Sequence, residues 1–270
     1  MTNNKISIMG ILNVTPDSFS DGGHFDDLNN ALTKARTLIQ EGVDIIDIGG
    51  ESTRPGAKEV HVDTELDRVI PVIRTIKNLC LDNNIKISVD TRKSLVMKEA
   101  IKEGADIIND VTALTFDNKS IDIVSNSQSE ICLMHMQNSP ENMQDNPYYN
   151  DIISEIYDYL NSRINQCIAS GISKDKIIID PGIGFGKTLN DNFKIFNNLS
   201  KFNELGVRVM LGASRKSFID KISPNNTPPD RRVGGSLAAV AMGINRGVSI
   251  FRVHDVFETK QFIDVYNKEK

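Results

Sequence analysis

The chain has 270 residues, of which 39% are hydrophobic and 25% are charged. These are the proportions of a globular protein that buries a large core, so a disordered chain is excluded. Acidic side chains outnumber basic ones, the formal net charge at pH 7 is −5, and no cluster of lysine and arginine stands out. Nucleic acids and anionic membranes are therefore not expected as partners.

The sequence shows no segment typical of membrane insertion or export. Its longest apolar runs, such as residues 177–179, are far shorter than the roughly 20 residues that span a bilayer. The first residues lack the apolar stretch of a signal peptide. Cys80, Cys132 and Cys167 lie far apart among apolar neighbours without metal-ligand spacing, so we expect reduced thiols in the core. Together these features predict a cytoplasmic protein.

Eight short runs rich in isoleucine and valine recur along the chain. They span residues 5–9, 44–48, 86–89, 106–108, 130–134, 176–179, 207–211 and 249–253. The runs are nearly continuous in apolar residues, which is typical of parallel strands buried on both faces. Each run leads through a loop into a helical pattern, so the sequence predicts eight strand–helix units.

The segments between the strands have helical periodicity. We predict amphipathic helices over residues 28–39, 64–80, 118–127, 152–168, 233–244 and 256–263, of which 118–127 has the weakest pattern. Asp26 or Asp27 can cap the first of them, and Pro71 should kink the second or divide it in two. Three helices are followed by a glycine that can end them: Gly42, Gly171 and Gly247.

These units predict one α/β domain, a single (β/α)₈ barrel over residues 1–270, in preference to a doubly wound sheet. No Ser/Gly-rich linker or change of composition divides the chain, and the strand starts recur about every 35 residues, near the size of a strand–helix unit. Four connections are long: 12–25, 49–61, 137–149 and 224–230. We expect the loops after the first and second strands to be mobile lids.

A polar side chain follows every predicted strand. Singly, an aspartate or asparagine there is most often a helix cap or turn former, and a histidine is most often structural. In a barrel, however, these strand ends meet at one mouth, where convergent polar groups indicate a ligand pocket. The groups are Asn13, residues 49–54, Asp90, Asn109, His135, Asp180, residues 214–216 and residues 252–254. They suit a phosphate-bearing substrate with a heterocycle that carries N–H donors.

Two nucleotide-binding motifs are excluded after the sixth predicted strand. The stretch PGIGFGKT, residues 181–188, would place the first glycine of a phosphate-binding loop on Pro181. It also reads G-x-G-x-G instead of the dinucleotide pattern G-x-G-x-x-G. Its glycines are better explained by tight turns or by close approach of the backbone to a ligand.

Five segments resemble the dihydropteroate synthases of the folate pathway. They are GILNVTPDSFSDGG (10–23), DIGGESTRPG (47–56), DPGIGFGK (180–187), GASRKSF (212–218) and RVHD (252–255). The resemblance runs in order from the first strand to the last and implies a (β/α)₈ barrel. It also implies the reaction: 6-hydroxymethyl-7,8-dihydropterin pyrophosphate alkylates the amine of 4-aminobenzoate, which gives dihydropteroate and pyrophosphate.

The resemblance assigns residues to the pterin and to its pyrophosphate. The pterin pocket corresponds to Asp90, Asn109, Asp180 and Lys216, with Arg252 stacked on the ring. Pyrophosphate is implied to contact Thr53, Arg54, Arg252 and His254, and Asn13 matches a ligand of Mg²⁺, the implied cofactor.

The resemblance also assigns the 4-aminobenzoate site and the catalytic groups. The benzoate residues are Phe19, Thr53, Pro55, Phe185, Lys216 and Ser217, and the catalytic groups are Asp21, Arg54, Lys216 and His254. We expect Ser217 to begin a helix whose N–H groups receive the carboxylate. The arylamine is neutral at pH 7 and needs no strong base, so Asp21 is interpreted as stabilising a methylene cation after pyrophosphate leaves. Sulphonamides, which mimic 4-aminobenzoate, are expected to compete.

Two other functions remain open. The pterin-binding domain of corrinoid methyltransferases shares this fold, but it would lack the lid sequence TPDSFSD and the RVH segment, both of which are present. A non-catalytic pterin-binding paralogue is a different class, and retention of Asn13, Arg54, Lys216 and His254 gives it no support. The family implies a homodimer, and the apolar stripes at 240–244 and 256–263 either pack on the barrel or face a partner. The family's usual MHMQG is MHMQN here, so Asn138 is predicted to adopt a left-handed conformation.

Overall fold

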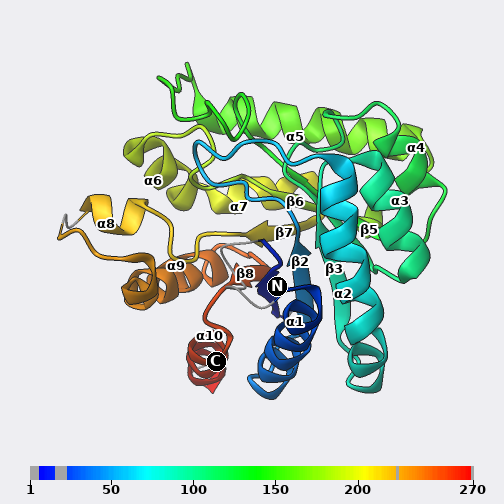
Figure 1. Ribbon diagram of the computed structural model, residues 1–270. Coiled ribbons are helices and arrows are strands. Elements are labelled where there is room, and N and C mark those ends of the chain that lie inside the picture. Colours follow the sequence, from blue (N-terminus) through cyan, green and yellow to red (C-terminus); the bar gives the residue numbers. More distant parts are fainter. Residues whose placement is uncertain (1–5, 16–22, 223–224, 269–270) are drawn as a thin grey trace.

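The computed structural model describes residues 6–15, 23–222 and 225–268. Within them eight parallel strands pair in chain order, and the eighth pairs with the first to close a barrel (Figure 1). The strands are β1 (Ser7–Asn13), β2 (Ile45–Gly49), β3 (Lys86–Asp90), β4 (Ile107–Asp110), β5 (Glu130–Met134), β6 (Ile177–Asp180), β7 (Arg208–Leu211) and β8 (Ile250–Val253). The predicted (β/α)₈ barrel is confirmed.

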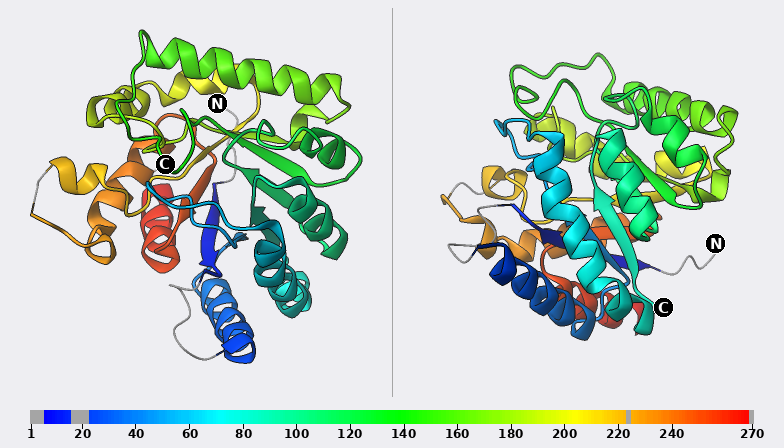
Figure 2. Two further views of the ribbon diagram at one scale, coloured as in Figure 1. Left: turned by 45° about the horizontal axis from the view of Figure 1, so that its top comes forward. Right: turned by 45° about the vertical axis from the view of Figure 1, so that its right-hand side comes forward.

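The helices lie around the outside of the strands in all three views (Figures 1 and 2). They are α1 (Gly23–Gln40), α2 (Val62–Asp82), α3 (Ser94–Glu103), α4 (Ser120–Ser125), α5 (Ile152–Ala169), α6 (Leu189–Asn197), α7 (Leu199–Phe202), α8 (Phe218–Ile222), α9 (Val233–Ile244) and α10 (Val256–Lys268). Short 3₁₀ turns occupy Lys174–Lys176, Asn203–Leu205 and Pro229–Arg231. None of the helices that the structure describes is long and apolar enough to cross a membrane.

Strand β1 extends beyond the predicted end at residue 9. It continues to Asn13 because residues 9–13 pair in register with β2, ending with Asn13 opposite Gly49. Gly10 looks like a strand breaker in the sequence, but here it makes room for packing: a Cβ on it would lie 3.0 Å from the side chains of Val43 and Val256. The extension carries Asn13 to the mouth of the barrel, and the first loop is correspondingly shorter than predicted.

The helices differ from the predictions at three points. Helix α1 begins at Gly23, so Asp26 and Asp27 lie inside it and neither is its N-cap. Helix α2 runs undivided through Pro71. A proline removes one hydrogen bond from a helix, and the buried residues on both sides, Val69 and Ile73 among them, keep the helix packed on the sheet. Helix α4 is also shorter than the predicted 118–127.

The core has two parts, which correspond to the two faces of the closed sheet. The larger part lies between the strands and the helices and includes Val240, Val256 and Ile263, so these residues of the last two helices pack on the barrel. The smaller part fills the barrel as a plug: Met9, Ile45, Ile107, Cys132, Ile178, Met210 and Ile250. Cys80, Cys132 and Cys167 are all buried free thiols, as predicted.

Candidate active site

The polar site lies next to this apolar plug, on the side of the carboxyl ends of the strands. Side chains on a strand alternate between its two faces, so the next inward position is two residues further along each strand. Those positions are Ile11, Asp47, Asn109, Met134, Asp180, Gly212 and Arg252, and on β3 the corresponding end position is Asp90. The strand ends therefore bring the predicted Asp90, Asn109, Asp180 and Arg252 into one layer.

Arg252 connects the acids of this layer. Its Nε lies 2.6 Å from Asp47 Oδ2, and its Nη2 lies 2.8 Å from Asp90 Oδ2. Asn109 Nδ2 donates to the same Asp47 oxygen at 3.3 Å. Asp47 is fully buried, and its Oδ1 has no hydrogen-bond partner within the described part of the chain. Asp47 was not predicted as a site residue, although its inward position two residues before Gly49 was a usable signal.

Burial and neighbouring charges set the protonation of the layer. Burial raises the pKa of Asp90, and the Arg252 guanidinium opposes that shift. Burial also raises the pKa of Asp180, against the charges of Lys216, Lys187 and Arg252. Burial lowers the pKa of Lys216 to about 8, although Asp180 favours its charged form. The layer thus holds acids and cations whose charges depend on one another, and it can present hydrogen-bond acceptors to a polar ring.

The turn after β6 brings Phe185 and Lys216 together. Asp180 Oδ1 accepts the N–H of Gly182 at 2.7 Å and starts this turn. Gly182 has φ +71°, and a Cβ there would lie 2.0 Å from the carbonyl oxygen of His135, so only glycine fits. Lys216 Nζ donates to the carbonyl of Ile183 and stands 4.5 Å from the centre of the Phe185 ring. An aromatic face and a cation thus lie side by side next to the acid layer.

The phosphate-binding candidates lie at or just after the ends of β1, β2 and β8. The ring Nδ1 of His254 is 3.0 Å from Ser214 Oγ. Burial, together with the charges of Arg252, Arg215 and Arg54, lowers the pKa of His254 to about 3, so the ring is neutral at pH 7. The charge of Arg54 acts on His254 although Arg54 follows β2 and His254 follows β8. Asn13 Oδ1 lies 3.3 Å from where a Cβ on Gly49 would stand, so the glycine leaves space beside it.

The loop residues predicted for 4-aminobenzoate are more open to solvent. Thr53 and Phe185 are half-buried, whereas Pro55 and Ser217 are exposed, as is Arg54, which was predicted for the pyrophosphate. Ser217 directly precedes α8, as predicted, but α8 has only five residues, so aligned peptide dipoles contribute little there. Phe19 and Asp21 lie outside the residues that the structure describes.

A second charged cluster lies at the base of the β2–α2 loop. Glu51 accepts from Arg92 Nη2 at 2.8 Å and from Lys93, and Lys93 Nζ also contacts Glu65 at 2.6 Å. The Arg92 guanidinium lies 4.1 Å from the centre of the Phe116 ring. The sequence analysis missed this cluster, which anchors the start of the loop that carries Thr53 and Arg54.

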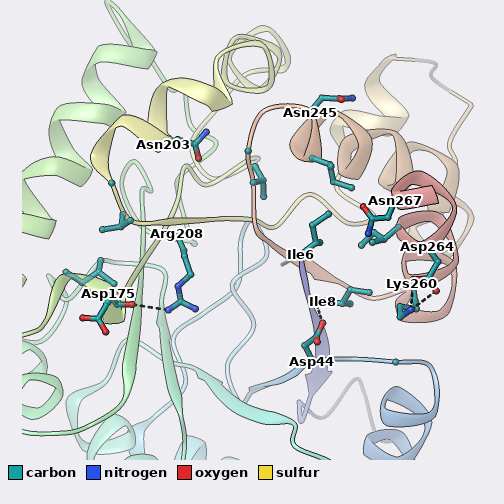
Figure 3. A pocket seen from close by; sticks show the side chains of 18 of the residues that line it. Ile6, Ile8, Asp44, Asp175, Asn203, Arg208, Asn245, Lys260, Asp264 and Asn267 are labelled. Atoms are coloured by element: carbon teal, nitrogen blue, oxygen red, sulfur yellow. Dashed lines mark hydrogen bonds and ion pairs between the residues drawn. The ribbon is translucent and has the colours of Figure 1, made fainter. Parts of the chain in front are cut away.

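The opposite end of the barrel has a different character. A cavity of about 1460 Å³ lies at the amino-terminal ends of the strands. Figure 3 shows side chains that line it, among them Ile6, Ile8, Arg208 and Lys260. Two of its charged groups form ion pairs: Lys260 with Asp264, and Arg208 with Glu130. Residues at this end of a (β/α)₈ barrel usually serve stability, whereas active sites lie at the carboxyl ends of the strands. The chemistry therefore belongs to the mouth described above.

The neutral ring of His135 predicts a pH effect on stability. Burial, and then the charge of Lys187, lower the pKa of His135 to about 2. Between pH 7 and 5 the unfolded chain takes up a proton that the folded chain refuses, so stability falls as the pH drops. Urea unfolding of His135→Gln is expected to show about 2 kcal/mol less loss over this interval than the unsubstituted protein. His61→Gln, at an exposed ring, is the control, and equal losses in all three proteins would contradict the assignment.

Known proteins match this chain in sequence and in fold. A model of the family described as pterin binding enzyme matches residues 9–254. The dihydropteroate synthase of Haemophilus influenzae is 43% identical over 259 residues, which cover 96% of this chain and 92% of that protein. The Yersinia pestis dihydropteroate synthase, solved with a sulfonamide drug, has a TM-score of 0.90 and 42% identity over 98% of this chain and 94% of the other.

A second solved structure adds a ligand of another kind. The dihydropteroate synthase of Xanthomonas albilineans with 4-aminobenzoic acid has a TM-score of 0.90 and 42% identity, and the match covers 98% of this chain and 93% of the other. Sequence and structure thus match over nearly the whole of both chains. The chain belongs to the dihydropteroate synthase family of pterin-binding enzymes.

Proposed function

We propose that this chain joins 6-hydroxymethyl-7,8-dihydropterin pyrophosphate to 4-aminobenzoate to form 7,8-dihydropteroate and pyrophosphate. The observation that carries the proposal is the acid layer bound by Arg252 next to the Lys216–Phe185 pair at one barrel mouth. The first can receive a heterocycle with N–H donors, and the second a flat ring with a carboxylate. The C–O bond to pyrophosphate breaks, a C–N bond forms, and the arylamine gives its proton to solvent.

The pterin half of the site uses acceptors and donors of complementary kind. Asp90 and Asp180 would accept from the ring N–H and amino groups, and Asn109 can both donate and accept. Lys216 would donate to the ring carbonyl. The guanidinium of Arg252 is held on two sides by Asp47 and Asp90, which leaves its face free to stack on the pterin. Pairing of all these buried groups favours the pterin over rings that lack its donors.

The leaving pyrophosphate would lie against the cationic side of the mouth. Arg54 and Arg252 would stabilise its charge, Thr53 would donate its hydroxyl, and the neutral His254 would donate a ring N–H. Because the electron-rich pterin can delocalise a methylene cation, loss of pyrophosphate before the amine attacks is favourable. The cation is short-lived, so the site has to exclude water while it exists.

The open space beside Asn13 suits a magnesium ion that pyrophosphate also ligates. An amide oxygen is an acceptable Mg²⁺ ligand, and this ion commonly takes few protein ligands and completes its shell with phosphate oxygens and water. No group of three His, Cys, Asp or Glu side chains in the described segments could hold a metal alone. We therefore include Asn13 as the protein ligand, where bound Mg²⁺ would neutralise charge on the leaving group.

The benzoate half of the site needs orientation and no strong base. The ring of 4-aminobenzoate would lie between Phe185 and Pro55 with Phe19 nearby, and its carboxylate would be received by the backbone N–H and hydroxyl of Ser217, close to Lys216. The amine is neutral at pH 7 and reaches the methylene carbon directly. A sulphonamide has the same arylamine and an anionic group at the other end, so we propose that it competes for this position.

The catalytic role proposed for Asp21 has its own test. We expect Asp21→Asn to slow turnover by about 10²-fold and to leave pterin affinity nearly unchanged, because the carboxylate would act on the cation and not on the bound ground state. Single-turnover kinetics and calorimetric binding of the pterin measure the two quantities separately. Equal losses in both would show that Asp21 is a binding residue.

The proposed function is tested by calorimetric binding of 4-aminobenzoate with and without pyrophosphate and Mg²⁺, followed by assay of the full reaction. Binding that depends on pyrophosphate and Mg²⁺, with formation of dihydropteroate, supports the synthase. A protein that binds pterin pyrophosphate and never releases pyrophosphate is instead a pterin-binding paralogue. Methyl transfer to a corrinoid in place of dihydropteroate formation would identify the methyltransferase alternative.

A further inference from the structure

Lys187 is a buried amine that the proposed reaction does not use, and burial lowers its pKa to about 7. Its side chain is only 2% exposed, although lysine is among the residues least often found inside proteins. Its Nζ lies 2.8 Å from the carbonyl oxygen of Phe185, 3.2 Å from the carbonyl oxygen of His135 and 3.1 Å from the ring Nδ1 of His135. All three donor positions of the ammonium group are therefore used by neutral acceptors.

Burial of the Lys187 amine lowers the stability of the fold, which indicates that the residue has a role other than stability. Among the residues that the structure describes, no carboxylate forms an ion pair with Lys187, and Asp180 and Asp191 act on it only through their charges. A buried cation without a direct anionic partner is unfavourable. His135 must stay neutral to accept from the ammonium group, and burial keeps its ring neutral. The pair thus holds together two loops that come from different strands, β5 and β6.

The contacts of Lys187 converge on the turn that carries Phe185. Further bonds hold the same turn from the same side: Gln144 donates to the carbonyl of Gly184 at 2.5 Å, and Tyr149 donates to the carbonyl of Gly186 at 2.8 Å. A Cβ on Gly186 would lie 2.7 Å from the side chain of Gln137, so the two loops are in close contact. The ring of Phe185 in turn contacts Lys216, whose Nζ lies 4.5 Å from the ring centre. Lys187 bonds to the carbonyl of Phe185, whose own N–H donates to the carbonyl of Gly182 at 3.1 Å.

We propose that Lys187 is a positioning residue that fixes the backbone of Phe185, and so the aromatic wall of the 4-aminobenzoate site, by clamping the β6–α6 turn to the β5–α5 loop. The proposal rests on the proposed function, because it takes Phe185 as a wall of that site. Removal of the clamp weakens binding of the benzoate substrate and leaves the pterin layer intact. The effect acts through Phe185, so Lys187 contacts neither substrate.

The test compares Lys187→Met with Lys176→Met. Lys176 lies at the far end of β6 and contacts Gln128, so its replacement controls for loss of a lysine next to the same strand. In the full synthase assay, Lys187→Met is expected to raise KM for 4-aminobenzoate at least 10-fold and to change KM for the pterin substrate less than 2-fold. Lys176→Met is expected to change neither. Lys187→Gln, which keeps a donor without the charge, is expected to be intermediate.

A second measurement reports on the conformation of the β6–α6 turn and does not depend on enzyme activity. The chain contains no tryptophan, so Phe185→Trp introduces a single fluorophore at the clamped position. In that background Lys187→Met is expected to shift the emission to longer wavelength and to increase quenching by acrylamide, and Lys176→Met is not. If the methionine variant does not fold, Lys187→Gln serves for both measurements.

Two outcomes would overturn the proposal. An unchanged KM for 4-aminobenzoate together with unchanged tryptophan emission would make Lys187 a purely structural residue. A rise in KM for the pterin substrate alone would show that its charge supports Asp180 instead. Failure of the proposed function is seen separately, because the unsubstituted protein would then form no dihydropteroate, while the tryptophan measurement would still report whether Lys187 holds the turn.

Discussion

Arg252→Met is expected to lower the free energy of unfolding by about 3–5 kcal/mol and kcat/KM by about 10³-fold. The substitution removes a cation that lies 2.6 Å from Asp47 and 2.8 Å from Asp90, and Asp47 has no access to solvent. Both acids would then be buried without a counter-charge, and the pterin would lose its stacking partner. Urea unfolding and steady-state kinetics measure the two losses.

The pH dependence of Arg252→Met identifies the cause of its instability. Without the cation, the folded-state pKa of Asp90, which burial already raises, rises further above the unfolded value. The folded chain then holds more protons than the unfolded chain, so stability falls as the pH rises. The deficit should therefore be larger at pH 8 than at pH 5. Adding Asp47→Asn should restore part of the stability and none of the activity. A deficit that does not change with pH would point to lost packing instead.

Asp180→Asn is expected to weaken binding of the pterin substrate by about 10²–10³-fold without lowering stability. Its Oδ1 accepts from Gly182, and an asparagine oxygen can keep that bond. The Oδ2 oxygen faces the space left by Gly212, where a Cβ would lie 3.3 Å away. The amide would place a donor there, opposite the ring donors of the pterin, and an unpaired polar contact of this kind loses affinity strongly.

Stability of Asp180→Asn should stay the same or increase. Burial raises the pKa of Asp180, which means that the folded protein disfavours its charged form, and the neutral amide removes that penalty. Thermal unfolding and calorimetric pterin binding test the pair of expectations. Asp175→Asn, at an exposed acid beside Ser173 at the opposite end of β6, is the matched control. A large fall in melting temperature with unchanged affinity would assign Asp180 to the fold and not to the site.

Regular periodicity made the barrel predictable from the sequence. Apolar runs and glycine stops gave all eight strands, and helices α5 and α9 begin and end where the pattern predicts. The errors occurred where packing overrides a local signal: Gly10 continues a strand because neighbouring side chains need its space, and Pro71 stays within α2 because the helix is buried on both sides of it. Asn138, predicted to be left-handed, has φ +62°.

Site residues at the ends of strands could be predicted from the sequence. Contacts between loops could not. Asp90, Asn109, Asp180 and Arg252 share a layer because strand ends converge in a barrel. Asp47 was missed because it lies inside a strand. The contacts between loops, such as the Lys187 clamp and the bond from Gly56 N–H to the Pro140 carbonyl at 3.0 Å, join positions far apart in the chain, and no local pattern encodes them.

The pair of Asp47 and Arg252 also constrains how the protein forms during its synthesis. The two residues are 205 positions apart, and β8 is the last strand to leave the ribosome. Until β8 pairs with β7 and β1, the growing chain carries Asp47 and Asp90 without their cation, and an incomplete barrel leaves both flanking strand edges unpaired. The step that closes the barrel is therefore also the step that creates the pocket, and a chain arrested before β8 would hold the acids without a binding site.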